Sequence, residues 1–112
     1  MSRKRYNRRY ILNEHGQPVP EPDLLTWGLW FEEHANRIVA QEWVENVKIS
    51  TVFLGLDHNW FGKEPVLWET MTFSNNASFN HEVSCRCGGN REQAEAMHRT
   101  VVEQVREQLA KK

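Results

Sequence analysis

Residues 39–56 read VAQEWVENVKISTVFLGL, and this stretch decides the fold class. Apolar and β-branched residues alternate with polar ones on both sides of Glu45 and Asn46, which is the pattern of two strands joined by a tight turn. We therefore predict a hairpin of residues 39–44 with residues 47–56. The far end of the second strand, from Val52 onward, is apolar on both faces and needs cover on both sides.

Three further strands are predicted around this hairpin. Residues 66–73 follow Pro65, residues 81–87 run up to Gly88, and residues 6–12 run into a turn-forming NEHG sequence. The polar segment 74–80, rich in Asn and Ser, connects two of these strands, and we expect it to be mobile. Connections of hairpin length make the sheet antiparallel, because a parallel pair needs a long crossover.

Two helices complete the pattern. After Pro22 the apolar or aromatic side chains lie at positions 24, 27, 30, 31, 34 and 38, which is the spacing of an amphipathic helix. A second helix begins after Asn90, which forms a capping box with Gln93, and its apolar residues are Ala94, Met97, Val101, Val102, Val105 and Leu109. The order is β-α-β-β-β-β-α. We predict a two-layer α+β domain, with two amphipathic helices on one face of an antiparallel sheet of four to five strands.

Length and charge divide the chain into an arm and one domain. The 112 residues, 39% apolar and 26% charged, suit a single globular core. Five of the 14 basic residues precede the first acidic one, and they are Arg3, Lys4, Arg5, Arg8 and Arg9. We assign residues 1–9 to a basic N-terminal arm and residues 10–112 to a single domain. No stretch has the length and apolarity of a membrane span or a secretory signal, so we expect a cytoplasmic protein without membrane contact.

Three blocks carry a resemblance to a known family. They are RYILNEHGQPVPEPDLLTWGLWFE at 9–32, STVFLGLDHNWFGKEPVLWETMTF at 50–73 and REQAEAMHRTVVEQV at 91–105. Together they resemble a family of small hypothetical proteins encoded by bacteriophages, prophages and other bacterial mobile elements. The resemblance implies a protein that acts inside a bacterial host cell, but it supplies no activity, cofactor or functional residue. The stretch HEVSCRCGGN at 81–90 departs from the family, in which a cysteine-free polar strand is usual.

The loop GLDHNWFGK at 55–63 carries the candidate contact residues, which are Asp57, His58, Asn59, Trp60 and Phe61. Strand alternation cannot bury two adjacent aromatic side chains in a loop flanked by glycine, so we expect a stacking platform or a partner anchor there. Asp57 and His58 are residue types that perform acid–base work. Adjacent side chains rarely face each other, however, and turn chemistry also explains an Asp and an Asn. We therefore expect a ligand or partner contact in this loop and no catalytic residue.

The cysteines are candidates for a metal site or for the core. Cys85 and Cys87 lie on one side of a strand, where a disulfide between them would be strained, and a zinc ion would need His81 and His98 as further ligands. This spacing matches no common zinc signature. Val83, Cys85 and Cys87 also alternate as a core-facing row of small side chains. We expect a core row, no metal site and no cofactor.

No P-loop, GxSxG, HExxH or GxGxxG motif occurs, so we predict a non-enzymatic accessory protein that binds a host or phage macromolecule. Two alternatives remain: binding of a nucleotide or other small ligand, including an anti-defence role, through the 55–63 loop, and nucleic-acid binding through the arm. The strands also carry more apolar residues than two helices can cover, namely Val52, Leu54, Leu56, Leu67, Met71 and Phe73. We therefore expect a homodimer in which the partner supplies the second layer.

Overall fold

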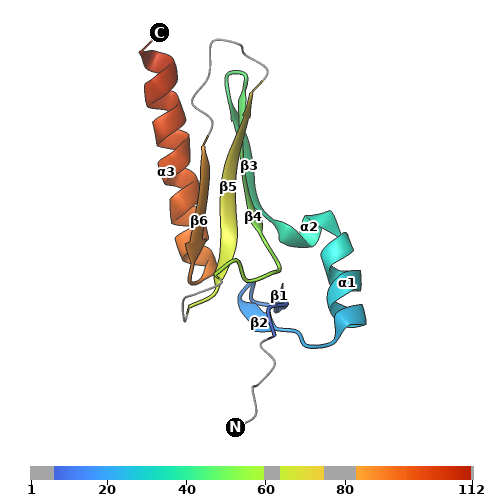
Figure 1. Ribbon diagram of the computed structural model, residues 1–112. Coiled ribbons are helices and arrows are strands. Elements are labelled where there is room, and N and C mark those ends of the chain that lie inside the picture. Colours follow the sequence, from blue (N-terminus) through green and yellow to red (C-terminus); the bar gives the residue numbers. More distant parts are fainter. Residues whose placement is uncertain (1–6, 60–63, 75–82, 112) are drawn as a thin grey trace.

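The computed structural model describes residues 7–59, 64–74 and 83–111. Its elements, in chain order, are β1 (Tyr10–Leu12), β2 (Pro18–Pro20), α1 (Leu24–Glu32), α2 (His34–Arg37), β3 (Ile38–Val44), β4 (Val47–Phe53), β5 (Val66–Ser74), β6 (Ser84–Gly88) and α3 (Arg91–Ala110). The last four strands form one antiparallel sheet in the order β3-β4-β5-β6, and β1 pairs with β2 in a separate small sheet (Figure 1). The predicted α+β class and the antiparallel sheet are confirmed.

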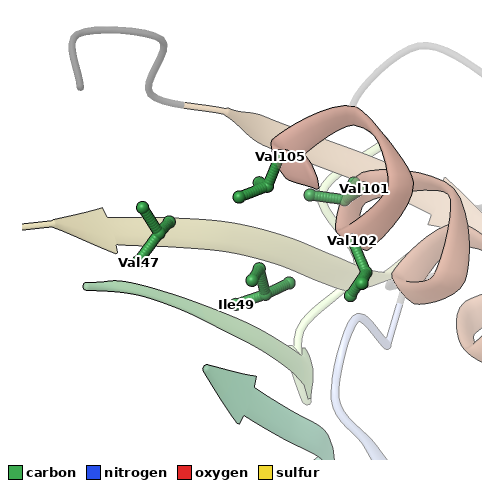
Figure 2. Close-up of a cluster of buried hydrophobic side chains, with 5 residues drawn as sticks. All are labelled: Val47, Ile49, Val101, Val102 and Val105. Carbon is green, nitrogen blue, oxygen red and sulfur yellow. The ribbon is translucent and has the colours of Figure 1, made fainter. Parts of the chain in front are cut away.

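Helix α3 runs along the sheet and contacts all four of its strands (Figure 1). It begins with the predicted capping box, in which the Gln93 amide donates to the Asn90 side chain over 3.0 Å and the Asn90 amide donates to the Gln93 side chain over 2.8 Å. Its apolar stripe packs on the strands in two clusters. Figure 2 shows the first, in which Val47 and Ile49 of β4 point toward Val101, Val102 and Val105. The second contains Phe53, Leu67, Trp68 and Ala94.

Strand β4 is three residues shorter than predicted. The hairpin itself is as expected, with Val44 opposite Val47 across Glu45 and Asn46. The strand ends at Phe53 because Gly55 takes a φ of +76°, a left-handed conformation that breaks the extended backbone. The chain then turns toward the N-terminal segment, where the Tyr10 amide donates to the Gly55 carbonyl over 2.9 Å.

The first helix differs most from the prediction, which placed one continuous helix up to residue 38. It ends at Glu32, Glu33 is extended (φ −80°, ψ 97°), and Ile38 already begins β3. The last carbonyls of α1 are capped from the following turn, since Asn36 donates to the Trp30 carbonyl and Arg37 to the Phe31 carbonyl, each over 3.0 Å. These side-chain caps satisfy the helix end and stabilise the break.

Helix α1 also lies in an unexpected place. It stands beside the end of the sheet, away from α3, and contacts β1 and α2 (Figure 1). Its link to the core is aromatic, because Trp30 meets Phe53 edge-on with ring centroids 5.7 Å apart. No residue of α1 is fully buried. Among the helices of the described residues, α3 alone runs along the face of the sheet, although two helices were expected there.

The N-terminal strand is shorter than the predicted 6–12, and residue 6 lies outside the described part of the chain. Its partner is the proline-flanked β2, with Ile11 opposite Val19. Proline is tolerated at such strand ends because neither nitrogen needs a ladder partner there. Tyr10 and Leu12 pack against the cluster that contains Leu67, and Leu67 is only 1% exposed. The prediction that Leu67 lies on an uncovered face is therefore wrong.

The face of the sheet opposite α3 is partly apolar, and some of its large side chains are exposed. Trp43, Lys48 and Phe73 lie side by side across β3, β4 and β5. Trp43 is 62% exposed and Phe73 49% exposed, whereas Val52 and Met71 of the same face are half-buried.

Within the described residues, no helix has the length and apolarity needed to cross a membrane.

Candidate functional site

Asp57 holds its loop together from inside. The residue is only 3% exposed, and its Oδ1 accepts the amide hydrogens of Asn59 over 2.8 Å and Val66 over 2.9 Å. Its own amide donates to the carbonyl of Arg8 over 2.9 Å. This is the turn role of an Asp side chain, which satisfies backbone donors near it. The carboxylate therefore organises the loop and lies away from its surface.

The neighbouring candidates close the base of the same loop. The Asn59 side chain donates to the Glu64 carbonyl over 2.6 Å, and the His58 amide donates to the Val66 carbonyl over 2.9 Å. These bonds bring together two chain segments, 57–59 and 64–66, that enter and leave the tip. Trp60 and Phe61, the predicted aromatic contacts, lie outside the described residues.

Two of the five basic residues assigned to the arm are bound to the domain. Arg8 Nη2 donates a hydrogen bond to the carbonyl of Asp57, and Arg9 Nη2 donates to the carbonyl of Pro22 over 2.8 Å. Both arginines are partly buried. Their guanidinium groups thereby stabilise the packing of the N-terminal segment. Arg3, Lys4 and Arg5 lie outside the described residues.

A buried polar network, absent from the sequence-based expectations, crosses the interface between α3 and the sheet. His98 is 3% exposed, with its Nδ1 2.6 Å from Thr51 Oγ1 and its Nε2 2.8 Å from Glu42 Oε1. Thr51 Oγ1 lies in turn 2.6 Å from Thr70 Oγ1. The signal was present in the sequence, because His98 occupies the apolar stripe of α3, four residues after Ala94.

The network has the chemical order of a carboxylate, an imidazole and a hydroxyl, which is the order of a nucleophilic triad. Thr51 and Thr70, however, are completely buried. A hydroxyl without access to solvent cannot reach a substrate, so the network acts in packing. Each polar side chain of the network has a hydrogen-bond partner, and these bonds set the position of α3 over β3, β4 and β5.

The two cysteines face α3 as expected for a core row. Cys85 packs against one hydrophobic cluster and Cys87 against the other, and both thiols are free. Burial raises the pKa of the Cys87 thiol. Among the residues with described positions, no three His, Cys, Asp or Glu side chains are grouped so as to hold a metal ion, and His81 is not among these residues.

The outer face of α1 is the most exposed apolar surface that the structure shows. Leu24, Leu25 and Leu29 are 64%, 71% and 57% exposed, and with Trp27, Gly28 and Glu32 they line a shallow hollow of about 530 Å³. The opposite side of the helix is already packed on the domain, since Trp30 meets Phe53 and the Trp27 indole donates to the Gly55 carbonyl over 3.0 Å. Trp27 also stacks on Phe31, with ring centroids 4.6 Å apart, and lies at the border between the two sides. Leu25 and Leu29 fall outside the predicted stripe, which was the signal for a second apolar face.

Comparison of the chain with protein-family models, with curated proteins and with solved structures finds no match. Function is therefore inferred from this chain alone, and its exposed candidates are the 55–59 segment and the outer face of α1.

Proposed function

We propose that this protein is a non-enzymatic binding protein whose main contact surface is the outer face of α1, formed by Leu24, Leu25, Gly28, Leu29 and Glu32. The partner is a protein of the bacterial host or of the phage or mobile element that encodes this chain, and binding takes place inside the host cell. One observation carries the proposal: three leucines on one side of α1 are more than half exposed, while the other side already packs on the domain.

Exposure of the leucine side chains of α1 to water is unfavourable in free energy. A helix that is apolar all round is normally buried on all sides. Burying one leucine side chain contributes about 1.5–3 kcal/mol, so three of them supply a large part of the free energy of a specific complex. An apolar helix face is recognised by a groove lined with apolar side chains. Glu32 is the one charged residue that lines the hollow, and it favours a cation at the rim of that groove.

A ligand site in the 55–63 loop has less support. The carboxylate of Asp57 and the amide of Asn59 already bind main-chain groups of the loop itself. A panel of nucleotides at millimolar concentration should therefore leave the melting temperature of the protein unchanged. A shift for any nucleotide would restore the small-ligand alternative.

The test compares the unmodified chain with two variants, one changed on α1 and one changed elsewhere. The Leu25→Gln/Leu29→Gln double variant and the Leu56→Gln control make the same chemical change, and Leu56 is an exposed leucine outside α1. Proteins captured from host lysate by the unmodified chain are identified by mass spectrometry, purified and titrated against all three chains. We expect at least about a tenfold loss of affinity for the double variant, because each buried leucine contributes more than 1.4 kcal/mol. Equal affinity for the double variant and the control would overturn the proposal.

A further inference from the structure

Strand β3 is an open edge of the main sheet. Within the described residues its only strand partner is β4, and most of its side chains are exposed. The opposite edge, β6, is two residues shorter and contains Arg86. Natural sheets blunt their edges with proline, lysine, β-bulges or very short strands, because unpaired main-chain groups there recruit another strand. The seven residues IVAQEWV of β3 contain neither proline nor lysine, and the one irregularity in their pairing with β4 lies near the start of the strand, between Ile38 and Ala40.

The hairpin geometry shows which main-chain groups of β3 are unpaired. Val44 and Val47 flank a two-residue turn, so their main-chain groups bond to each other, and the pairing then alternates along the strand. The N–H and C=O groups of Glu42 therefore point toward β4. Those of Gln41 and Trp43 point away from the sheet, where a further strand would bond to them.

We propose that this edge pairs with the same edge of a second copy of the chain, antiparallel, with the two-fold axis at Gln41. The proposal does not depend on the function assigned to α1. Gln41 is the midpoint of Ile38–Val44, so this axis overlaps the whole strand with its mate. It also places Gln41, whose main-chain N–H and C=O point outward, opposite Gln41 of the other copy. The two residues then form reciprocal hydrogen bonds at the axis. Two four-stranded sheets become one continuous sheet of eight strands.

Side-chain charge favours this register. With the axis at Gln41, Glu42 of one copy lies opposite Ala40 of the other, so no two like charges face each other. An axis at Glu42 would place two carboxylates directly opposite each other, which is destabilising. The irregularity in the β3–β4 pairing falls between Ile38 and Ala40, so residues 40–42 at the centre of the contact remain regular.

The surface of α3 next to this edge is also self-complementary. A hollow of about 320 Å³ between helix and strand is lined by Glu42, Arg99, Val102, Glu103 and Arg106. It carries two anions and two cations, and within one copy Glu103 pairs with Arg106 over 3.0 Å and Glu42 with His98 over 2.8 Å. A two-fold contact brings the same patch of each copy to the interface, so a patch that contains both signs can pair with itself.

The first test is the mass of the full chain in solution by sedimentation equilibrium, for which we expect twice 13.3 kDa. Gln41→Pro removes an outward N–H and leaves the main-chain bonds to β4, so it should give a monomer with an unchanged circular dichroism spectrum. The side-chain bond from Gln41 Nε2 to Ser50 Oγ, 3.0 Å long, is lost in Gln41→Pro and in Gln41→Ala alike. Gln41→Ala keeps the N–H and should remain a dimer. Trp43→Lys places a charge on the edge and should also give a monomer, which serves as the second variant if Gln41→Pro does not fold.

Cross-linking tests the register. Gln41→Cys should form an intermolecular disulfide on mild oxidation, located by peptide mapping, because opposed residues of an antiparallel pair have Cα atoms about 5.5 Å apart. Lys48→Cys, on the inner strand β4, should not. An unmodified chain that is monomeric at every concentration would overturn the proposal, as would folded Gln41→Pro and Trp43→Lys variants that stay dimeric. A dimer abolished by Phe73→Lys and cross-linked through Lys48→Cys would show face-to-face packing of the sheets, which also overturns it.

Discussion

Gly55 is the residue at which three separate parts of the chain meet. Its carbonyl accepts hydrogen bonds from the Trp27 indole over 3.0 Å and from the Tyr10 amide over 2.9 Å. Its φ is +76°, and a Cβ at this position would lie 2.8 Å from the ring of Phe31. Both the backbone conformation and the available space therefore require glycine.

Gly55→Ala should lower the free energy of unfolding by about 2 kcal/mol or more, from left-handed strain and overpacking against Phe31. Urea denaturation measures this. Gly28→Ala is the matched control, because its Cβ would meet nothing within 4 Å and the residue lies within α1. We expect that control to stabilise the protein by about 0.5–1 kcal/mol, through helix propensity. Similar effects of the two substitutions would contradict the packing described at Gly55.

Two substitutions test the His98 network. His98→Ala removes a buried ring and two hydrogen bonds, so we expect a loss of about 2–4 kcal/mol in chemical denaturation. Thr70→Val keeps the side-chain volume and leaves the bond between Thr51 and His98 in place, so its cost should be about 1 kcal/mol. A smaller loss for His98→Ala than for Thr70→Val would show that the imidazole is not central to the network.

The start of α1 depends on one side chain. The carboxylate of Asp23 accepts from the Thr26 hydroxyl over 2.6 Å and from the Thr26 amide over 2.8 Å. These bonds hold the pKa of Asp23 below its ordinary value of 3.8. The folded pKa lies below the unfolded one, so the stabilisation is present above pH 3.8 and is lost as the pH falls through the lower folded value.

An NMR titration should therefore show the Asp23 carboxyl and the Thr26 amide titrating together, below pH 3.8. Asp23→Asn provides the control, since an Asn side chain also caps a helix but does not titrate. In that variant the Thr26 amide should lose its pH dependence in this range. A titration of both signals at the ordinary value would show that the cap does not form.

Strand β6 offers a test of its packing on α3. Burial raises the pKa of the Cys87 thiol, which lowers the thiolate fraction at pH 8. Alkylation of Cys87 by iodoacetamide in the folded protein should be slower than alkylation of the same cysteine in urea, as measured by mass spectrometry of the peptide. Equal rates, after correction for the denaturant, would contradict the burial of Cys87 under α3.

The molecule as a whole is unequally stabilised. Helix α3 has five buried residues on the sheet, which are Ala94, His98, Val101, Val102 and Val105, whereas α1 has none. Local opening requires less free energy where fewer apolar contacts are broken. Hydrogen exchange should therefore be at least about tenfold faster in α1 than in the centre of α3. Equal protection of the two helices would mean that the outer face of α1 is covered in solution, and a drop on dilution would identify self-association as the cover.

The sequence by itself determined the elements whose cause is local. Alternation in 39–56 predicted the β3–β4 hairpin, although β4 ends at Phe53, and the helical stripe after Asn90 predicted α3 with its capping box. Both depend on residues a few positions apart, which propensity and periodicity describe. The same reasoning correctly marked residues 57–59 as turn-forming, but it could not tell that Asp57 would be buried.

Tertiary structure decided the features that depend on distant residues. The break at Glu33 is stabilised by the carbonyl contacts of Asn36 and Arg37, and α1 stands beside the sheet because its aromatic side chains pack on Phe53 and Gly55. His98 is buried because Glu42 and Thr51 lie opposite it. The periodicity of a sequence shows which side chains of one helix or strand lie on the same face. It does not show which of these faces packs against another element. The uncovered leucines of α1 and the open edge of β3 therefore became visible only when the chain was folded.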